Sequence, residues 1–88
     1  MTDLLSELKR KLVDTLRLAD VRPEEIDDDQ PLFGEGLGLD SIDVLELVVM
    51  LERDYGIKIE SKELGQRVFV SMRSMAEHIE KVRAGKAT

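Results

Sequence analysis

The sequence contains no cysteine and no tryptophan, and its only aromatic residues are two phenylalanines and one tyrosine. The absence of cysteine excludes disulfide bonds and zinc–thiolate sites, so any thiol would have to come from an attached group. With so few aromatic residues, the core has to be built from Leu, Val, Ile and Met, which favours packed helices over a β-sandwich. These absences indicate a helical protein that has no thiol chemistry of its own.

Long apolar runs are absent as well. No stretch approaches the roughly 20 residues of a transmembrane helix, and the N-terminus lacks the apolar segment of a signal peptide. Eighty-eight residues are expected to form one domain, over residues 1–88. We therefore expect a cytoplasmic, monomeric protein.

Basic residues are scarce in the middle of the chain. The net charge is −6, and residues 20–40 contain eight acidic residues but only one basic residue. Nucleic acid binding needs a basic face, so this distribution argues against it and predicts partners with basic patches. The acidic run Asp27–Asp29 does not follow the spacing of a calcium loop, so we predict a solvated loop there and no metal site.

A leucine stripe at helical spacing predicts a first helix from an N-cap at Thr2 to about Ala19. A long connection follows over residues 20–40, because Pro23 and Pro31 prevent a continuous helix. We expect this loop to be ordered and to lie across the bundle, since it offers several apolar residues for packing: Val21, Ile26, Leu32, Phe33 and Leu37.

A second helix is predicted from an N-cap at Asp40 to Gly56, with Asp43 favourable in its first turn. One stripe of this helix is assigned to the core: Val44, Leu47, Val48, Leu51 and Tyr55. Further apolar residues fall largely outside that stripe: Ile42, Leu45, Val49 and Met50. The helix is therefore more apolar than one buried stripe requires.

The region after Gly56 gives a weaker pattern. Residues 57–59 and 68–70 resemble strands, but we favour extended connections around a short helical turn near Ser61–Leu64. The last helix is clearer, with a capping box starting at Ser74 and an end at Gly85. Together these elements predict an all-α four-helix bundle, with three main helices, a short third helix and a long loop between the first two.

Ser41 lies at the start of the second helix, directly after a glycine-rich loop. His78 is the only histidine, and the sequence places no base beside Ser41, which argues against a nucleophilic enzyme. A helix N-terminus does favour a bound anion, and glycines leave room for a partner to approach. From the residues alone, Ser41 is a candidate for a phosphate ester.

The stretch Gly38-Leu39-Asp40-Ser41-Ile42-Asp43, continuing to Glu52, resembles the attachment signature of acyl carrier proteins. The similarity covers nearly the whole chain. Three further segments resemble the family at its expected positions: 21–26 after the first helix, 55–59 after the second, and 71–79 at the last.

The resemblance implies that Ser41, next to Asp40, carries 4′-phosphopantetheine transferred from coenzyme A by a phosphopantetheinyl transferase. Acyl groups would be attached to this arm as thioesters. The carrier would present them to acyl-transfer, ketosynthase-type and related enzymes of fatty-acid, polyketide or similar lipid biosynthesis. The chain itself would not be an enzyme. Partner enzymes would recognise acidic and apolar residues of the second helix, namely Asp40, Ile42, Asp43, Leu45, Glu46, Val49, Met50 and Glu52.

Two alternatives remain open at this stage. One is a carrier of aminoacyl, D-alanyl or peptidyl groups, although Gly-Leu-Asp-Ser favours the acyl type; the other is an unmodified acidic interaction protein, against which the intact Ser41 argues. The chain also departs from the family pattern. Ile42 stands where leucine is commoner, Arg53 stands where an acid is common, and Phe69 lies in a longer segment before the last helix.

Overall fold

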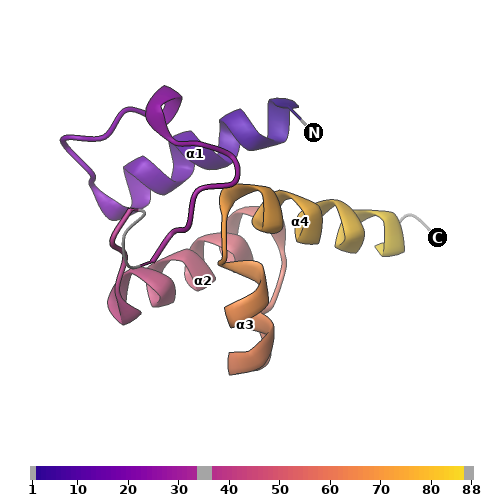
Figure 1. The fold of residues 1–88 in the computed structure, drawn as a ribbon. Helices are drawn as coiled ribbons and strands as arrows, with labels where there is room; N and C mark the ends of the chain where they lie inside the picture. Colours follow the sequence, from indigo (N-terminus) through magenta and orange to yellow (C-terminus); the bar gives the residue numbers. More distant parts are fainter. Residues whose placement is uncertain (1, 34–36, 87–88) are drawn as a thin grey trace.

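The structure, a computed structural model, describes residues 2–33 and 37–86. Four α-helices occupy most of this part: α1 (Thr2–Leu16), α2 (Ser41–Tyr55), α3 (Lys62–Val68) and α4 (Met72–Lys86). No strand occurs among the described residues, where a single β-bridge joins Phe33 and Leu39. Helix α3 runs across the direction of the other three helices (Figure 1). The predicted all-α bundle with a short third helix is confirmed.

Helix α1 packs against both α2 and α4 and buries leucines from one stripe: Leu4, Leu5, Leu8 and Leu12. Two predictions for this helix were wrong. Thr2 already lies within the helix, and the helix ends at Leu16 and not near Ala19. It ends early because Arg17 adopts a left-handed backbone conformation with φ of 52°, after which the Leu18 N–H donates to the Val13 carbonyl at 3.0 Å.

The long connection after α1 is ordered where it is described and contacts the bundle, as predicted. Ile26 and Leu32 are buried, and a 3₁₀ turn, η1 (Pro23–Glu25), packs on α1. The sequence had not predicted this turn. The loop runs from α1 past the start of α4 before it reaches α2 (Figure 1).

The acidic run Asp27–Asp29 does more than face solvent. Asp28 pairs with Lys9 of α1, and its carbonyl accepts from the backbone N–H of Arg73 at 2.8 Å. The Arg73 guanidinium also pairs with Asp29, and that hydrogen bond lowers the pKa of the Asp29 carboxyl. The run therefore ties the loop to α1 and α4.

Helix α2 buries Leu47, Met50 and Leu51. Met50 was predicted to lie outside the core, and the structure corrects this, because its side chain is fully buried. The physical reason is helical spacing: Met50 follows Leu47 by three residues and so shares its face. Three residues assigned to the core, Val44, Val48 and Tyr55, are only partly buried.

The ends of α3 and α4 also differ from prediction. Helix α3 extends to Val68, beyond the predicted turn, and Val68 and Phe69 are buried residues without strand structure. Helix α4 begins at Met72, two residues before Ser74, and continues through Gly85 instead of stopping there. The described helices do not include one that is long and apolar enough to cross a membrane.

Candidate functional site

The N-terminus of α2 is capped by two carboxylates. Asp40 Oδ1 accepts from the backbone N–H groups of Ile42, at 3.0 Å, and Asp43, at 3.1 Å. Asp43 Oδ2 in turn accepts from the Asp40 N–H at 3.1 Å. This reciprocal arrangement satisfies backbone donors that a helix start leaves unpaired. The predicted cap at Asp40 is confirmed, and it leaves Ser41 with no capping role.

Ser41 is the first residue of α2, and its side chain is exposed. Its hydroxyl makes no hydrogen bond to any residue that the structure describes. The hydroxyl is thus available to an enzyme that would esterify it, at a position where the helix dipole favours a negative charge.

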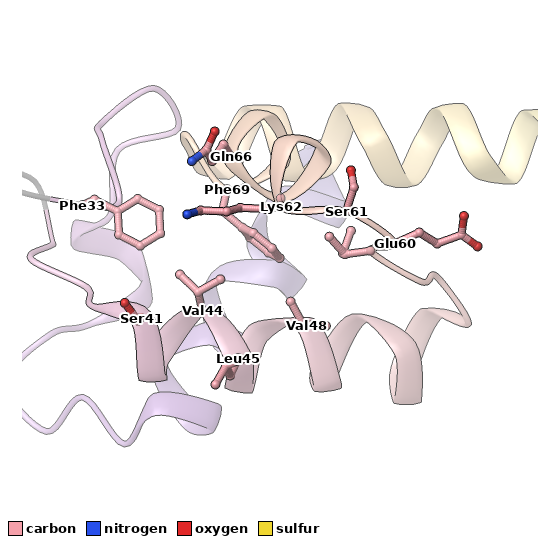
Figure 2. A pocket seen from close by; sticks show the side chains of 12 residues that line it. Phe33, Ser41, Val44, Leu45, Val48, Glu60, Ser61, Lys62, Gln66 and Phe69 are labelled. Atoms are coloured by element: carbon pink, nitrogen blue, oxygen red, sulfur yellow. The ribbon is translucent and has the colours of Figure 1, made fainter.

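Ser41 opens into a cleft of about 650 Å³ between α2 and α3. Figure 2 shows Ser41 at one end of this cleft, close to the ring of Phe33. The walls are mainly apolar and come from α2, the loop before α3, and the end of α3: Val44, Leu45, Val48, Ile59 and Phe69. The cleft can therefore receive an elongated, largely apolar group that begins at Ser41.

Polar side chains lie on the α3 side of the cleft, at Glu60, Ser61, Lys62 and Gln66. The sequence analysis did not single out these residues. Their place in the site depends on where α3 lies relative to α2, which no local pattern in the sequence indicates. Only the cap at Ser61, which accepts from the Leu64 N–H at 3.1 Å, follows a local pattern.

The face of α2 that points away from the core is apolar at its centre. Ile42, Leu45 and Val49 are 67%, 65% and 57% exposed, which is unusual for large apolar residues in such close proximity along one helix. Glu46 and Glu52 are exposed on the same helix. The structure thus brings the predicted recognition residues to the surface, with the exception of Met50 in the core and Asp43, half-buried in the cap.

Arg53, which departs from the family pattern, lies at the edge of this face and borders a shallow hollow with Ile42, Glu46 and Val49. Its guanidinium pairs with Asp54, whose pKa is lowered mainly by that hydrogen bond. Arg53 therefore adds a positive charge next to the acidic and apolar residues of α2.

His78 does not line the cleft at Ser41. It lies beside a separate hollow between α3 and α4, together with Arg67 and Lys81. Burial and the nearby Lys81 lower the pKa of the His78 imidazole, which favours its neutral form. Within the described residues, no group of three potential metal ligands comes together.

Comparison with known proteins agrees with this geometry. The family model described as "Phosphopantetheine attachment site" matches residues 6–79. The chain is 31% identical to the acyl carrier protein of Campylobacter hominis over 84 residues, covering 96% of this chain and 99% of the relative. It is 38% identical to the acyl carrier protein of Wolinella succinogenes over 60 residues, covering 68% and 74% of the two chains.

A further relative comes from a different setting. The anthracycline acyl carrier protein DpsG of Streptomyces peucetius is 42% identical over 62 residues, covering 70% of this chain and 71% of the relative. The family match includes Asp40, Ser41 and the whole of α2. The chain therefore belongs to the acyl carrier protein family, whose members carry 4′-phosphopantetheine and act as carriers and not as enzymes.

Proposed function

We propose that Ser41 is the residue that bears the 4′-phosphopantetheine arm. The observation that carries this proposal is the exposed Ser41 hydroxyl, unbonded among the described residues at a helix start that is already capped. Of the other serines, Ser61 caps α3, and Ser71 and Ser74 bond each other's backbone at the start of α4. Ser6 is exposed as well, but it lies within α1 and does not line the cleft. Ser41 also lines the large cleft, and in the sequence it follows a glycine-rich stretch.

The arm would supply the thiol that the chain lacks, and acyl intermediates would be attached to it as thioesters. A tether of this kind raises the effective concentration of the cargo at each enzyme it visits. The protein's own residues would hold the arm, cover or expose the cargo, and dock the carrier on each partner. No bond of the cargo would be broken by a side chain of this protein.

The proposal covers fatty-acid, polyketide and related lipid biosynthesis. The names of the relatives support this breadth, since they include plain acyl carrier proteins and an anthracycline carrier. The mainly apolar walls of the cleft support an acyl cargo over an aminoacyl one. Mass spectrometry of the thioester present on the native protein would identify the cargo, and an aminoacyl group there would contradict this assignment.

The attachment site is tested by intact-mass spectrometry after incubation with coenzyme A, magnesium and a broad-specificity phosphopantetheinyl transferase. We expect the wild-type chain to gain the mass of one phosphopantetheine and Ser41→Ala to gain none. Ser61→Ala is the matched control, because Ser61 also lies at a helix start and lines the same cleft. A mass gain that persists in Ser41→Ala would overturn the assignment.

We also propose that the exposed face of α2 docks on partners with basic patches, beginning with the transferase. Glu46→Lys reverses a charge beside the apolar centre of this face, so we expect a roughly fivefold lower kcat/KM at low salt, about 1 kcal/mol. Glu80→Lys makes the same charge change on an exposed residue of α4 and should leave the rate nearly unchanged. Equal rates for wild type and Glu46→Lys would mean that the acidic face is only solvated. The monomeric state and cytoplasmic location stay predictions from the sequence.

A further inference from the structure

The cleft at Ser41 has an uneven distribution of charge. Among the described residues that line it, Lys62 and Glu60 are charged. Figure 2 shows that the amino group of Lys62 points toward the end with Ser41 and Phe33, whereas the carboxylate of Glu60 lies at the opposite end of the cleft. The positive charge is therefore directed to the place where an arm on Ser41 would begin.

The arm begins with a phosphodiester, which keeps a negative charge at neutral pH. Next to Ser41, the N–H groups of Ile42 and Asp43 are already taken by Asp40, so the helix start has fewer free donors for this anion. The carboxylates of Asp40 and Asp43 lie on either side of Ser41 in the sequence and repel the negatively charged phosphodiester. A cation in the same cleft would offset both effects.

Lys62 fits this role. It is the first residue of α3, is exposed, and makes no ion pair with a carboxylate of the described residues. Its aliphatic stem can lie along apolar walls while the ammonium group remains at the polar rim. Gln66, one turn later on α3, lines the cleft beside it and offers an amide to the polar groups of an arm.

We infer that Lys62 contacts the phosphodiester of the arm on Ser41 and directs the arm into the cleft between α2 and α3. This inference rests on the proposed attachment at Ser41. One exposed ammonium–phosphate contact is weak and sensitive to salt, so the arm exchanges between a docked and a released state. Lys62 is then a positioning residue that sets how often the cargo is available to a partner enzyme.

The test uses the full chain, before and after attachment of the arm, in four forms: wild type, Lys62→Gln, Lys62→Arg and Lys58→Gln. Lys58→Gln is the matched control, because it removes the same charge from an exposed residue that does not line the cleft. Two-dimensional ¹H–¹⁵N NMR measures the change in amide shifts on attachment, and nuclear Overhauser effects report contact between residue 62 and the arm methylene next to the phosphate.

In the wild type and Lys58→Gln we expect attachment to shift the amides of Gln66 and Val48 and to give the Overhauser contact. Lys62→Gln should lose the contact and more than half of these shifts, whereas Lys62→Arg should retain them. Raising the salt concentration to about 1 M should bring the wild type to the level of Lys62→Gln.

Intact-mass measurements distinguish a failure of the proposed attachment at Ser41 from a failure of the inference about Lys62. If the wild-type chain gains no phosphopantetheine, the proposed function fails and this inference fails with it. If every form gains the arm but Lys62→Gln shows the same shifts as the wild type, the inference alone is overturned. The same holds if shifts are confined to residues next to Ser41 in every form.

Discussion

Helices α2 and α4 both begin with side chains that bond backbone N–H groups, but they leave their serines in opposite states. At α4, Ser71 Oγ accepts from the Ser74 N–H at 3.2 Å, and Ser74 Oγ accepts from the Ser71 N–H at 2.9 Å. The Ser74 hydroxyl also lies 2.6 Å from the Val68 carbonyl, to which it donates. At α2 the carboxylates of Asp40 and Asp43 accept from the backbone N–H groups, and the Ser41 hydroxyl makes no hydrogen bond among the described residues.

The surroundings of the two helix starts differ as well. Ser71 is only 7% exposed, and the loop before α2 covers this end of α4 through the Arg73 contacts to Asp28 and Asp29. Ser41 is exposed beside a cleft. A serine at a helix start is thus part of the structure when it caps, and open to modification when another residue caps in its place.

The largest expected effect on stability comes from replacing Ser74 by alanine, with Ser41→Ala as the comparison. Ser74→Ala leaves the Ser71 N–H and the Val68 carbonyl without a partner at a partly buried site, so we expect the free energy of unfolding to fall by about 1–3 kcal/mol. Ser41→Ala removes no hydrogen bond to a described residue and should change it by less than about 0.5 kcal/mol.

Urea unfolding of the two variants and the wild type, followed by circular dichroism, measures both values. An equal loss for both variants would contradict the contrast between the two serines. It would mean that the Ser41 hydroxyl contributes to the fold, and so is less accessible to a modifying enzyme than its exposure indicates.

A smaller effect is expected at the cap of α2. Asp40→Ala removes the acceptor for the N–H groups of Ile42 and Asp43, which should cost about 1 kcal/mol. Asp40→Asn keeps an acceptor oxygen at the same place and is the matched control, with a loss of only a few tenths of a kcal/mol expected. Urea unfolding distinguishes the two, and an Asp40→Ala variant as stable as the wild type would show that Ser41 or solvent takes over the cap.

The sequence predicted the start of α2 well because all its interactions are local. Asp40 and Asp43 reach backbone groups two or three residues away, and Gly56 ends the helix with a φ of 67° that glycine adopts without strain. Such patterns can be recognised in a single sequence. This is also why the predicted helix bounds agree with the structure.

The start of α4 was placed at Ser74 because serine followed three residues later by Glu77 is a common capping box. The structure uses Ser71 instead. Backbone bonds from Leu32 to Val70, at 3.0 Å, and from Arg73 to Asp28 hold the segment just before and at the helix start. These contacts join residues about forty positions apart, which no local pattern reveals.

The cleft and the burial of Met50 were missed for related reasons. Helical spacing places Met50 on the face of Leu47, but α2 is apolar over more than one face, and the neighbours that pack on it decide which face is buried. Lys62 and Gln66 join the site because α3 lies over α2. Attachment at Ser41 could thus be proposed from its motif, whereas the residues that would hold an arm depend on tertiary packing.

The smallest expected effect concerns the ion pair that holds the loop over the start of α4. The hydrogen bond from Arg73 lowers the pKa of Asp29 in the folded protein below its usual 3.8. This carboxylate therefore contributes stability above pH 3.8, and the contribution is lost as the pH falls through the folded-state pKa. Arg73→Gln should be slightly less stable than the wild type at pH 6, and the difference should shrink in acid.

Urea unfolding of the wild type and Arg73→Gln between about pH 6 and pH 3 measures this difference. Asp29→Asn should give the same shallow dependence on pH, and the double variant should show no further change, because both residues belong to one pair. A constant difference across this range would assign the role of Arg73 to other contacts, such as that with Asp28. The start of α4 would then be covered without help from the ionised Asp29, and its contrast with the open start of α2 would rest on the backbone bonds and the paired serines.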